Sequence, residues 1–93
     1  MEISYAIFFH EIVIKEDLPQ LDSVWKENIR KAIHLKLKTS PELYGAPLRQ
    51  TLKGLRKLRV GDYRIIYKIE GKVVKIIIID HRRVVYRKIL KRI

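Results

Sequence analysis

The sequence predicts an α+β fold, in which a small antiparallel sheet carries helices on one side. Strand-like segments stand at the N-terminus and in the C-terminal half, and a segment with helical periodicity lies between them. Two short connections that contain glycine separate the C-terminal strands, so these strands should form a meander of three to four strands. The chain has 93 residues, and we expect residues 1–93 to form a single domain.

The first expected strand covers residues 3–9, where β-branched and aromatic residues follow one another. The next stretch, HEIVIKEDLPQL, is ambiguous. Its apolar residues 12–14 suit a strand, whereas the polar residues on either side suit a short helix, and Pro19 interrupts either one.

The segment DSVWKENIRKAIHLKLK has a clear helical pattern. Apolar residues recur at every fourth position, at Trp25, Ile29, Ile33 and Leu37. This spacing predicts an amphipathic helix of about 15 residues. Asp22 or Ser23 can cap its N-terminus, and Ser40–Pro41 closes the region beyond it.

The remaining segments read as a connection followed by strands. TSPELYGAPLRQTLKG holds two prolines and two glycines and should be irregular. LRKLRV alternates, and Gly61–Asp62 and Glu70–Gly71 are expected tight turns on either side of the strand YRIIYKI. KVVKIIII is apolar on both faces and should be the central strand. HRRVVY either extends it or begins another strand, and RKILKRI should be a short basic helix or tail.

Positive charge is concentrated in the C-terminal half. Residues 1–47 hold six Lys and Arg against seven Asp and Glu, whereas residues 48–93 hold 15 against three. The formal net charge is +11. This asymmetry favours a polyanionic partner, such as nucleic acid, an acidic membrane surface or an acidic protein segment. The plain alternative is a well-solvated charged surface.

Several classes of chemistry find no support in the sequence. The chain has no cysteine, so disulfides and thiolate chemistry are excluded. Its histidines lack metal-ligand spacing, and its glycines form no phosphate-binding loop. No segment is long enough to span a bilayer, and the N-terminal residues do not resemble a signal peptide. We therefore expect a cytoplasmic protein without a membrane partner.

Two motifs in the C-terminal half point to a known family. VGDYRIIY is followed about 15 residues later by HRRVVY, with a basic strand before them and an apolar strand between them. This arrangement resembles the RelE/ParE superfamily of bacterial and archaeal toxins. The resemblance is densest over residues 48–87 and extends to the N-terminal strand and the helical region. It implies two N-terminal helices on the sheet, the first formed by HEIVIKEDL.

The resemblance also implies a toxin of a type II toxin–antitoxin system. Such a toxin is a monomer that a short, acidic antitoxin holds inactive in a hetero-oligomeric complex. RelE-like members enter the ribosomal A site, beside ribosomal RNA, and cut the mRNA there without a metal or other cofactor. The ribose 2′-OH attacks the adjacent phosphate and yields a 2′,3′-cyclic phosphate. ParE-like members poison DNA gyrase with the same fold, and a degenerate toxin that only binds RNA or antitoxin is a third alternative.

Cleavage of this kind needs a base for the 2′-OH, cations for the phosphorane charge and an acid for the leaving oxygen. The planar guanidinium of arginine suits the second task. The resemblance assigns Arg64 to the scissile phosphate and Arg82 to the transition state or leaving group. The base stays open between His81 and Tyr86. A free histidine titrates at about pH 6.5, whereas a free tyrosine, with a pKa of about 10, needs nearby cations.

Basic residues around the first strand of the meander should hold the RNA. Lys57 and Arg59 share one face of that strand, as the basic residues of RelE-like toxins do. Those toxins often carry a further Lys two residues before Lys57, where this chain has Leu55. The other candidates for RNA binding are Arg56, Lys53 and Arg83. If the central strand continues, Arg83 points away and is structural or an antitoxin contact.

Overall fold

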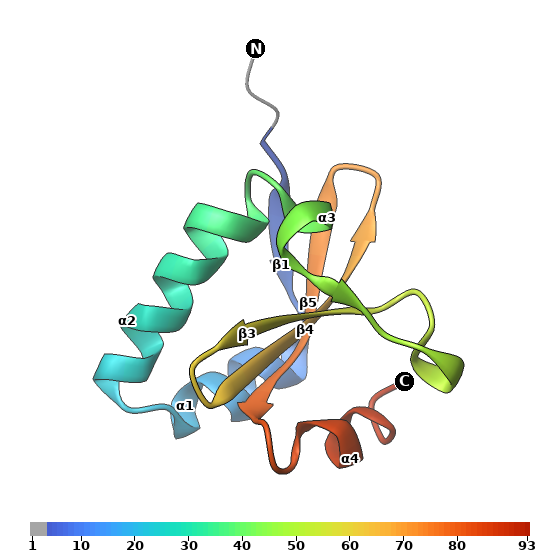
Figure 1. Cartoon of the computed structure of the whole chain (residues 1–93). Coiled ribbons are helices and arrows are strands. Elements are labelled where there is room, and N and C mark those ends of the chain that lie inside the picture. Colours follow the sequence, from blue (N-terminus) through green and yellow to red (C-terminus); the bar gives the residue numbers. More distant parts are fainter. Residues whose placement is uncertain (1–3) are drawn as a thin grey trace.

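The computed structural model describes residues 4–93 of the chain. Five strands form one mixed sheet in the order β1-β5-β4-β3-β2 (Figure 1). The strands are β1 (Ala6–Phe9), β2 (Ala46–Pro47), β3 (Arg56–Val60), β4 (Tyr63–Glu70) and β5 (Val73–His81). The helices are α1 (Leu18–Gln20), α2 (Ser23–Ala32), α3 (Pro41–Tyr44) and α4 (Val85–Ile89), with π-helical turns at Val13–Asp17 and Ile33–Leu37 and a 3-10 turn at Gln50–Leu52. The predicted α+β class is confirmed.

Strands β3, β4 and β5 form the predicted meander. Gly61 and Gly71 have φ angles of 58° and 62°, which two-residue hairpin turns require and which glycine adopts without steric cost. The first turn lies at Gly61–Asp62, as predicted. The second lies one residue later than predicted, because Glu70 still pairs with Val73 as the last residue of β4.

The N-terminal strand departs from the antiparallel arrangement that we expected. β1 pairs with β5 in parallel, with Ala6 opposite Val73 and Phe9 opposite Ile76. A tight turn forces two neighbouring strands to run antiparallel, but helices separate β1 from the rest of the sheet, so no turn fixes its direction. Ile3, at which we expected the strand to begin, lies outside the described residues.

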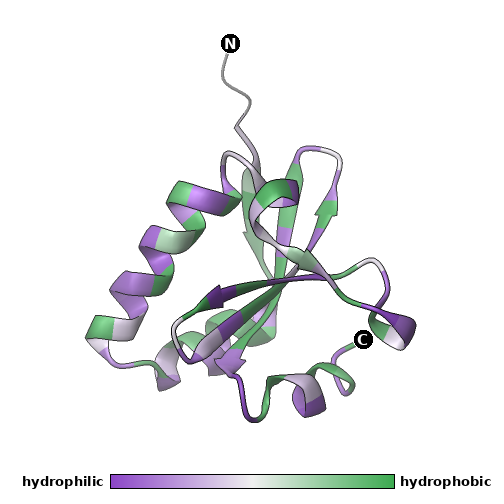
Figure 2. Cartoon of the chain, viewed as in Figure 1, coloured by the Kyte–Doolittle hydropathy of each residue, from purple (hydrophilic) through white to green (hydrophobic). Residues whose placement is uncertain are grey.

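The predicted amphipathic helix is confirmed. α2 continues directly into the π-helical turn Ile33–Leu37, and its side chains alternate between hydrophilic and hydrophobic stripes (Figure 2). Asp22 caps the helix by accepting a hydrogen bond from the Trp25 backbone N–H at 2.9 Å. The ambiguous stretch before α2 is helical, as the resemblance implied. Across residues 4–93, no helix is long and apolar enough to cross a membrane.

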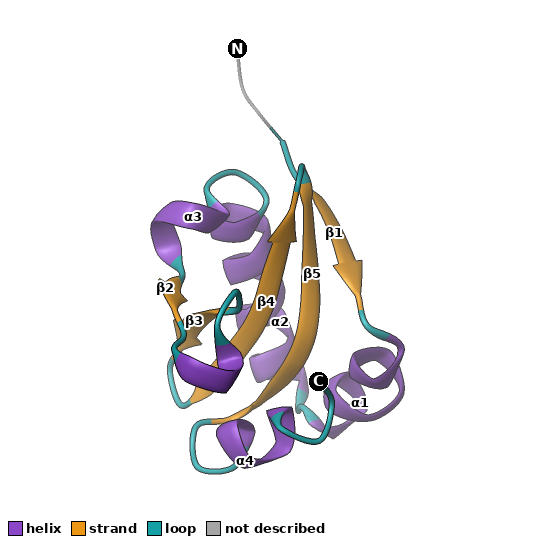
Figure 3. Cartoon of the chain, turned by 90° about the vertical axis from the view of Figure 1, so that its right-hand side faces the viewer, coloured by secondary structure: helices purple, strands orange, loops and turns teal. Residues whose placement is uncertain are grey.

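The sheet has a hydrophobic core on each face. On the face covered by α1 and α2, which we call the α2 face, the core residues are Val13, Leu21, Ile29, Ile33, Leu37, Leu58, Ile65, Tyr67, Val74, Ile76 and Ile79. On the other face, which we call the α4 face, they are Leu55, Ile66, Ile78, Val85 and Ile89. α4 lies below the end of β5 that leads into it (Figure 3). A bulge at Ile77 lets two successive residues of β5 face α4.

Candidate functional site

The α4 face of the sheet collects three cationic side chains. Side chains alternate along β3, so Lys57 and Arg59 lie on the same face as Leu55, which belongs to the core beneath α4. In β4, Arg64 pairs with Arg59, and Ile66 pairs with Lys57. Residues that pair across neighbouring strands share a face. Lys57, Arg59 and Arg64 therefore point to the same side of the sheet.

Arg64 is buried, with only 8% of its surface exposed. Its Nη1 donates hydrogen bonds to the backbone oxygens of Gly61 and Tyr63, each at 2.9 Å. We expected Arg64 outside the core; it is on the predicted face but lies against the hairpin turn. Within residues 4–93, every buried side-chain nitrogen has a partner, so its Nε and Nη2, which have none, reach solvent.

Arg64 has no carboxylate partner among the described residues. Asp80 pairs with Arg64 across the strands, but its Oδ2 binds Lys88 Nζ at 2.7 Å and its Oδ1 accepts the His81 backbone N–H at 2.7 Å. A buried cation without a counter-ion is costly unless an anion binds it. Nε and Nη2 of Arg64 are therefore left to donate to solvent or to a ligand.

α4 places Tyr86 beside β3. Val85 and Ile89 lie one helical turn apart and pack into the core against Ile66. Tyr86 follows Val85 and is half-buried, and its ring centroid lies 5.6 Å from Lys57 Nζ. This is a cation–π contact, and it joins α4 to the cationic strand.

Arg82 approaches the same hairpin turn from β5. Its backbone N–H donates to the Asp62 backbone oxygen at 2.8 Å, and its Nε lies 3.8 Å from Asp62 Oδ1. Arg64 binds the preceding residue, Gly61, so both arginines are anchored to one turn. The Arg82 side chain is 51% exposed and so can turn toward a ligand.

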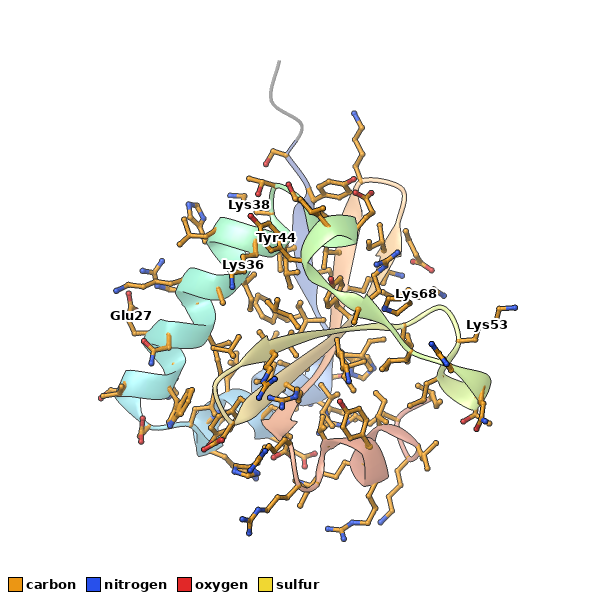
Figure 4. All side chains as sticks on the ribbon, viewed as in Figure 1. Glu27, Lys36, Lys38, Tyr44, Lys53 and Lys68 are labelled. Carbon is orange, nitrogen blue, oxygen red and sulfur yellow. The ribbon has the colours of Figure 1, made fainter. Side chains whose placement is uncertain are left out.

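Four other candidates lie away from this group. His81 pairs with Tyr63, which packs against the core of the α2 face, and the two rings meet edge to face at 5.8 Å. Arg56 also lies on the α2 face, where its Nη1 donates to the Gly45 backbone oxygen at 2.7 Å. Lys53 extends into solvent from an exposed loop (Figure 4). Arg83 is exposed in the turn before α4.

Another tyrosine lies inside the core and is unsuited to proton transfer. Tyr67 is fully buried, and its hydroxyl donates to the Pro41 backbone oxygen at 2.6 Å. Burial raises the pKa of Tyr67 to about 12. No three His, Cys, Asp or Glu side chains in the described part of the chain lie close enough together to hold a metal ion.

The sequence analysis missed a second charged pair next to α4. Arg92, near the C-terminus, binds the buried carboxylate of Asp17. The sequence did contain an indication that Asp17 is buried. Val13, Asp17 and Leu21 are spaced four apart, and all three lie on the buried stripe of the first helical segment. A buried carboxylate needs a cation, but the sequence offers 21 Lys and Arg from which to choose.

The cationic group, which consists of Lys57, Arg59 and Arg64, has the chemistry to bind a phosphodiester. Lys57 and Arg59 lie two residues apart along β3, which is about 7 Å, and Arg64 pairs with Arg59 on the neighbouring strand. Arginine can hold phosphate oxygens through two parallel hydrogen bonds. The Tyr86 ring of α4 lies beside Lys57, one of these cations.

The chain is similar to known toxins in sequence and in fold. The family model described as the ParE toxin of type II toxin–antitoxin systems matches residues 9–86. Toxin RelG of Mycobacterium tuberculosis is 37% identical over 54 residues, which cover 56% of this chain and 62% of RelG. The aligned part thus spans less than two thirds of that relative.

Two solved structures resemble the whole described fold. One is the toxin–antitoxin complex RelBE2 of M. tuberculosis, with a TM-score of 0.80 and 29% identity over 86% of this chain and 100% of the matched chain. The other is a mutant of E. coli toxin RelE in the free state, with a TM-score of 0.73 and 28% identity over 97% of this chain and 98% of that one.

Proposed function

This chain belongs to the ParE toxin family of type II toxin–antitoxin systems, and from the geometry of its α4 face we propose that it is a metal-independent endoribonuclease that cuts mRNA on the ribosome. The observation that carries the proposal is the buried Arg64, which has open donors and no counter-ion in the described residues. A toxin that acted only by protein–protein contact would have no need for such an anion site beside a half-buried tyrosine.

The proposed roles follow from position. Arg64 and Lys57 hold the non-bridging oxygens of the scissile phosphate and stabilise the charge of the phosphorane. Arg59 holds the neighbouring phosphate, and Arg82 turns from Asp62 to the leaving group. Arg83 and Lys53 lie away from Lys57, Arg59 and Arg64, and they contact only the RNA backbone in this proposal.

The proton of the 2′-OH goes to Tyr86 in this mechanism. The 2′-oxygen forms a bond to phosphorus, the bond from phosphorus to the 5′-oxygen breaks, and the 5′-oxygen takes up a proton from a solvent water molecule, leaving a 2′,3′-cyclic phosphate and a 5′-OH. We favour Tyr86 over His81 because Tyr86 contacts Lys57, whereas His81 contacts Tyr63 on the α2 face. The Lys57 ammonium would balance the charge of the phenolate.

A protein antitoxin is the proposed regulator. The similar RelBE2 structure is a toxin–antitoxin complex, and the C-terminal half of this chain, with 15 Lys and Arg against three Asp and Glu, would attract an acidic partner. A disordered acidic segment that folds on binding could cover the α4 face and exclude RNA.

Inhibition of DNA gyrase is the second candidate function. The matching family model carries the ParE name, and this observation favours it. A gyrase inhibitor needs a protein-binding surface but no pairing of a phosphate site with a proton acceptor. Arg64→Gln should therefore spare toxicity if gyrase is the target and abolish it if RNA is the target.

The test is single-turnover cleavage of mRNA on programmed ribosomes and of the same RNA without ribosomes. We expect wild-type protein to cut the ribosome-bound mRNA and Tyr86→Phe to cut it about 100-fold or more slowly, since a positioned general base contributes roughly 10²–10⁴-fold. His81→Gln should cut the same mRNA at a rate close to that of the wild-type protein.

Lys31→Gln is the matched control, because it removes one exposed cation from α2 on the opposite side of the sheet. Products must carry a 2′,3′-cyclic phosphate. Intact mRNA together with trapped gyrase–DNA complexes would refute the proposal in favour of the second candidate.

A further inference from the structure

A buried ion pair joins the first helical segment, through Asp17, to the C-terminal tail, through Arg92. Arg92 donates two hydrogen bonds to Asp17, from Nη1 to Oδ2 and from Nη2 to Oδ1, each at 2.7 Å. The Asp17 side chain is 3% exposed and that of Arg92 is 10% exposed. Such a two-point, desolvated contact is among the strongest and most directional polar contacts in proteins. The hydrogen bond to Asp17 also raises the pKa of the Arg92 guanidinium.

The pair is attached to the sheet where β1 ends. The last pair of β1 and β5 is Phe9 with Ile76, so the following residues of β5 have no strand on that side. Arg92 Nη1 donates to the Ile77 backbone oxygen at 3.1 Å, and Asp17 Oδ2 accepts the Ile79 backbone N–H at 2.9 Å. The ion pair thus occupies backbone groups that a neighbouring strand would otherwise pair.

The ion pair gives α4 an attachment in addition to the packing of Val85 and Ile89 into the core. It has five residues, and a helix of this length does not hold itself in water. Arg92 lies three residues after Ile89 and donates its backbone N–H to the Ile89 oxygen at 2.9 Å, so it continues the last turn of α4. Before the helix, Arg82 contacts Asp62 through its backbone N–H and a half-exposed side chain, and in the last turn of α4 Lys88 binds Asp80.

We propose that Asp17 and Arg92 are positioning residues that hold α4 against β5 and thereby keep the Tyr86 ring beside Lys57. The effect on cleavage rests on the proposed function, whereas the placement of Tyr86 does not. Neither residue reaches the cationic group itself, so both act through Tyr86.

A double-mutant cycle tests whether Arg92 affects cleavage through Tyr86. Arg92→Gln should slow single-turnover cleavage at saturating protein by at least about tenfold while RNA affinity changes by less than about threefold. In the Tyr86→Phe background, Arg92→Gln should cause no further loss, because the group that it positions is already absent. Equal losses in both backgrounds would overturn the proposal, as would wild-type rates in Arg92→Gln. Lys91→Gln, an exposed neighbour in the same tail, is the charge-matched control.

NMR tests the placement without cleavage. The Tyr86 ring should shift the Cε proton signals of Lys57 upfield in the wild-type protein. Arg92→Gln should remove this shift, while the signals of residues in the core of the α2 face keep their folded-state positions. If Arg92→Gln does not fold, Arg92→Lys, which keeps the charge but loses the two-point contact, should still reduce the shift. An unchanged shift would overturn the proposal. If wild-type protein cuts no RNA, the proposed function fails and the shift alone decides the placement.

Discussion

The most informative single residue is Arg64, because burying a cation without a carboxylate partner is energetically costly. Two backbone oxygens of the hairpin turn satisfy Nη1, which fixes the guanidinium plane before any ligand arrives. Fixed donors aimed at developing charge stabilise a transition state without the cost of reorganisation.

Arg64→Lys tests this geometric role. Lysine keeps the charge but cannot bind the turn and a phosphate with one planar group. We expect RNA affinity to change by less than about fivefold and the cleavage rate to fall about 100-fold, the typical effect of losing one preorganised donor. Single-turnover rates and binding titrations measure the two effects separately. Arg30→Lys, on the outer side of α2, should change neither; a cleavage rate in Arg64→Lys close to that of wild type would argue against the role.

The limits of sequence reasoning are also visible at single residues. Alternation along the strands placed Lys57 and Arg59 on one face of β3 and Arg64 opposite Tyr63 in β4, but it could not show that the three share a side of the sheet, which follows from strand pairing. It could not predict that Arg64 folds back on the turn, because that depends on the twist of the finished hairpin. Nor could it separate His81 from Tyr86. His81 ends β5, whereas Tyr86 lies in α4, and we had predicted that residues 81–86 extend the central strand or begin another, with a short helix or tail only after them.

Among the elements, α3 shows how a short helix is fixed by a neighbour rather than by its own sequence. Its four residues lie in a stretch rich in proline and glycine, for which we predicted irregular structure. The hydroxyl of Tyr67, in β4, accounts for part of the difference, because it binds the oxygen of Pro41, the first residue of α3. A contact 26 residues away in the chain leaves no local signal.

Tyr67→Phe should loosen α3 and alter stability in a pH-dependent manner. At neutral pH the Pro41 oxygen loses its partner, and we expect a cost of about 1–2 kcal/mol in the free energy of unfolding. The raised pKa of about 12 means that Tyr67 contributes fully below the ordinary tyrosine value and that this contribution is lost as the pH rises toward 12.

Chemical denaturation from pH 7 to pH 11.5 measures both effects. The wild-type protein should lose more stability above pH 10 than Tyr67→Phe does, so the gap between the two should narrow. Tyr44→Phe, at the exposed end of α3, is the control for removing a hydroxyl. A gap that stays constant across this range would show that Tyr67 ionises as easily in the folded chain as in the unfolded one.

At the scale of the whole molecule, one sheet serves two tasks. The α2 face holds the larger core and its helices, whereas the α4 face combines a small core with the cationic group. The charge asymmetry of the sequence predicted a polyanion partner but not which face would meet it. Strand pairing turns Lys57 and Arg59 toward α4 and Arg56 toward α2, and this difference is the basis on which we propose the α4 face as the binding surface.

RNA affinity should therefore depend on salt through the α4 face alone. Each phosphate contact to single-stranded RNA lowers the slope of log K against log salt by about 0.7, so contacts by Lys57, Arg59, Arg64 and Arg82 predict a slope of roughly −2 to −3. Arg59→Gln should reduce the steepness by about 0.7, because this exposed residue would neutralise one phosphate. Lys31→Gln removes the same charge from the opposite side and should leave the slope unchanged. Equal slope changes in the two variants would mean that RNA responds to net charge alone and that the α4 face is not the binding surface.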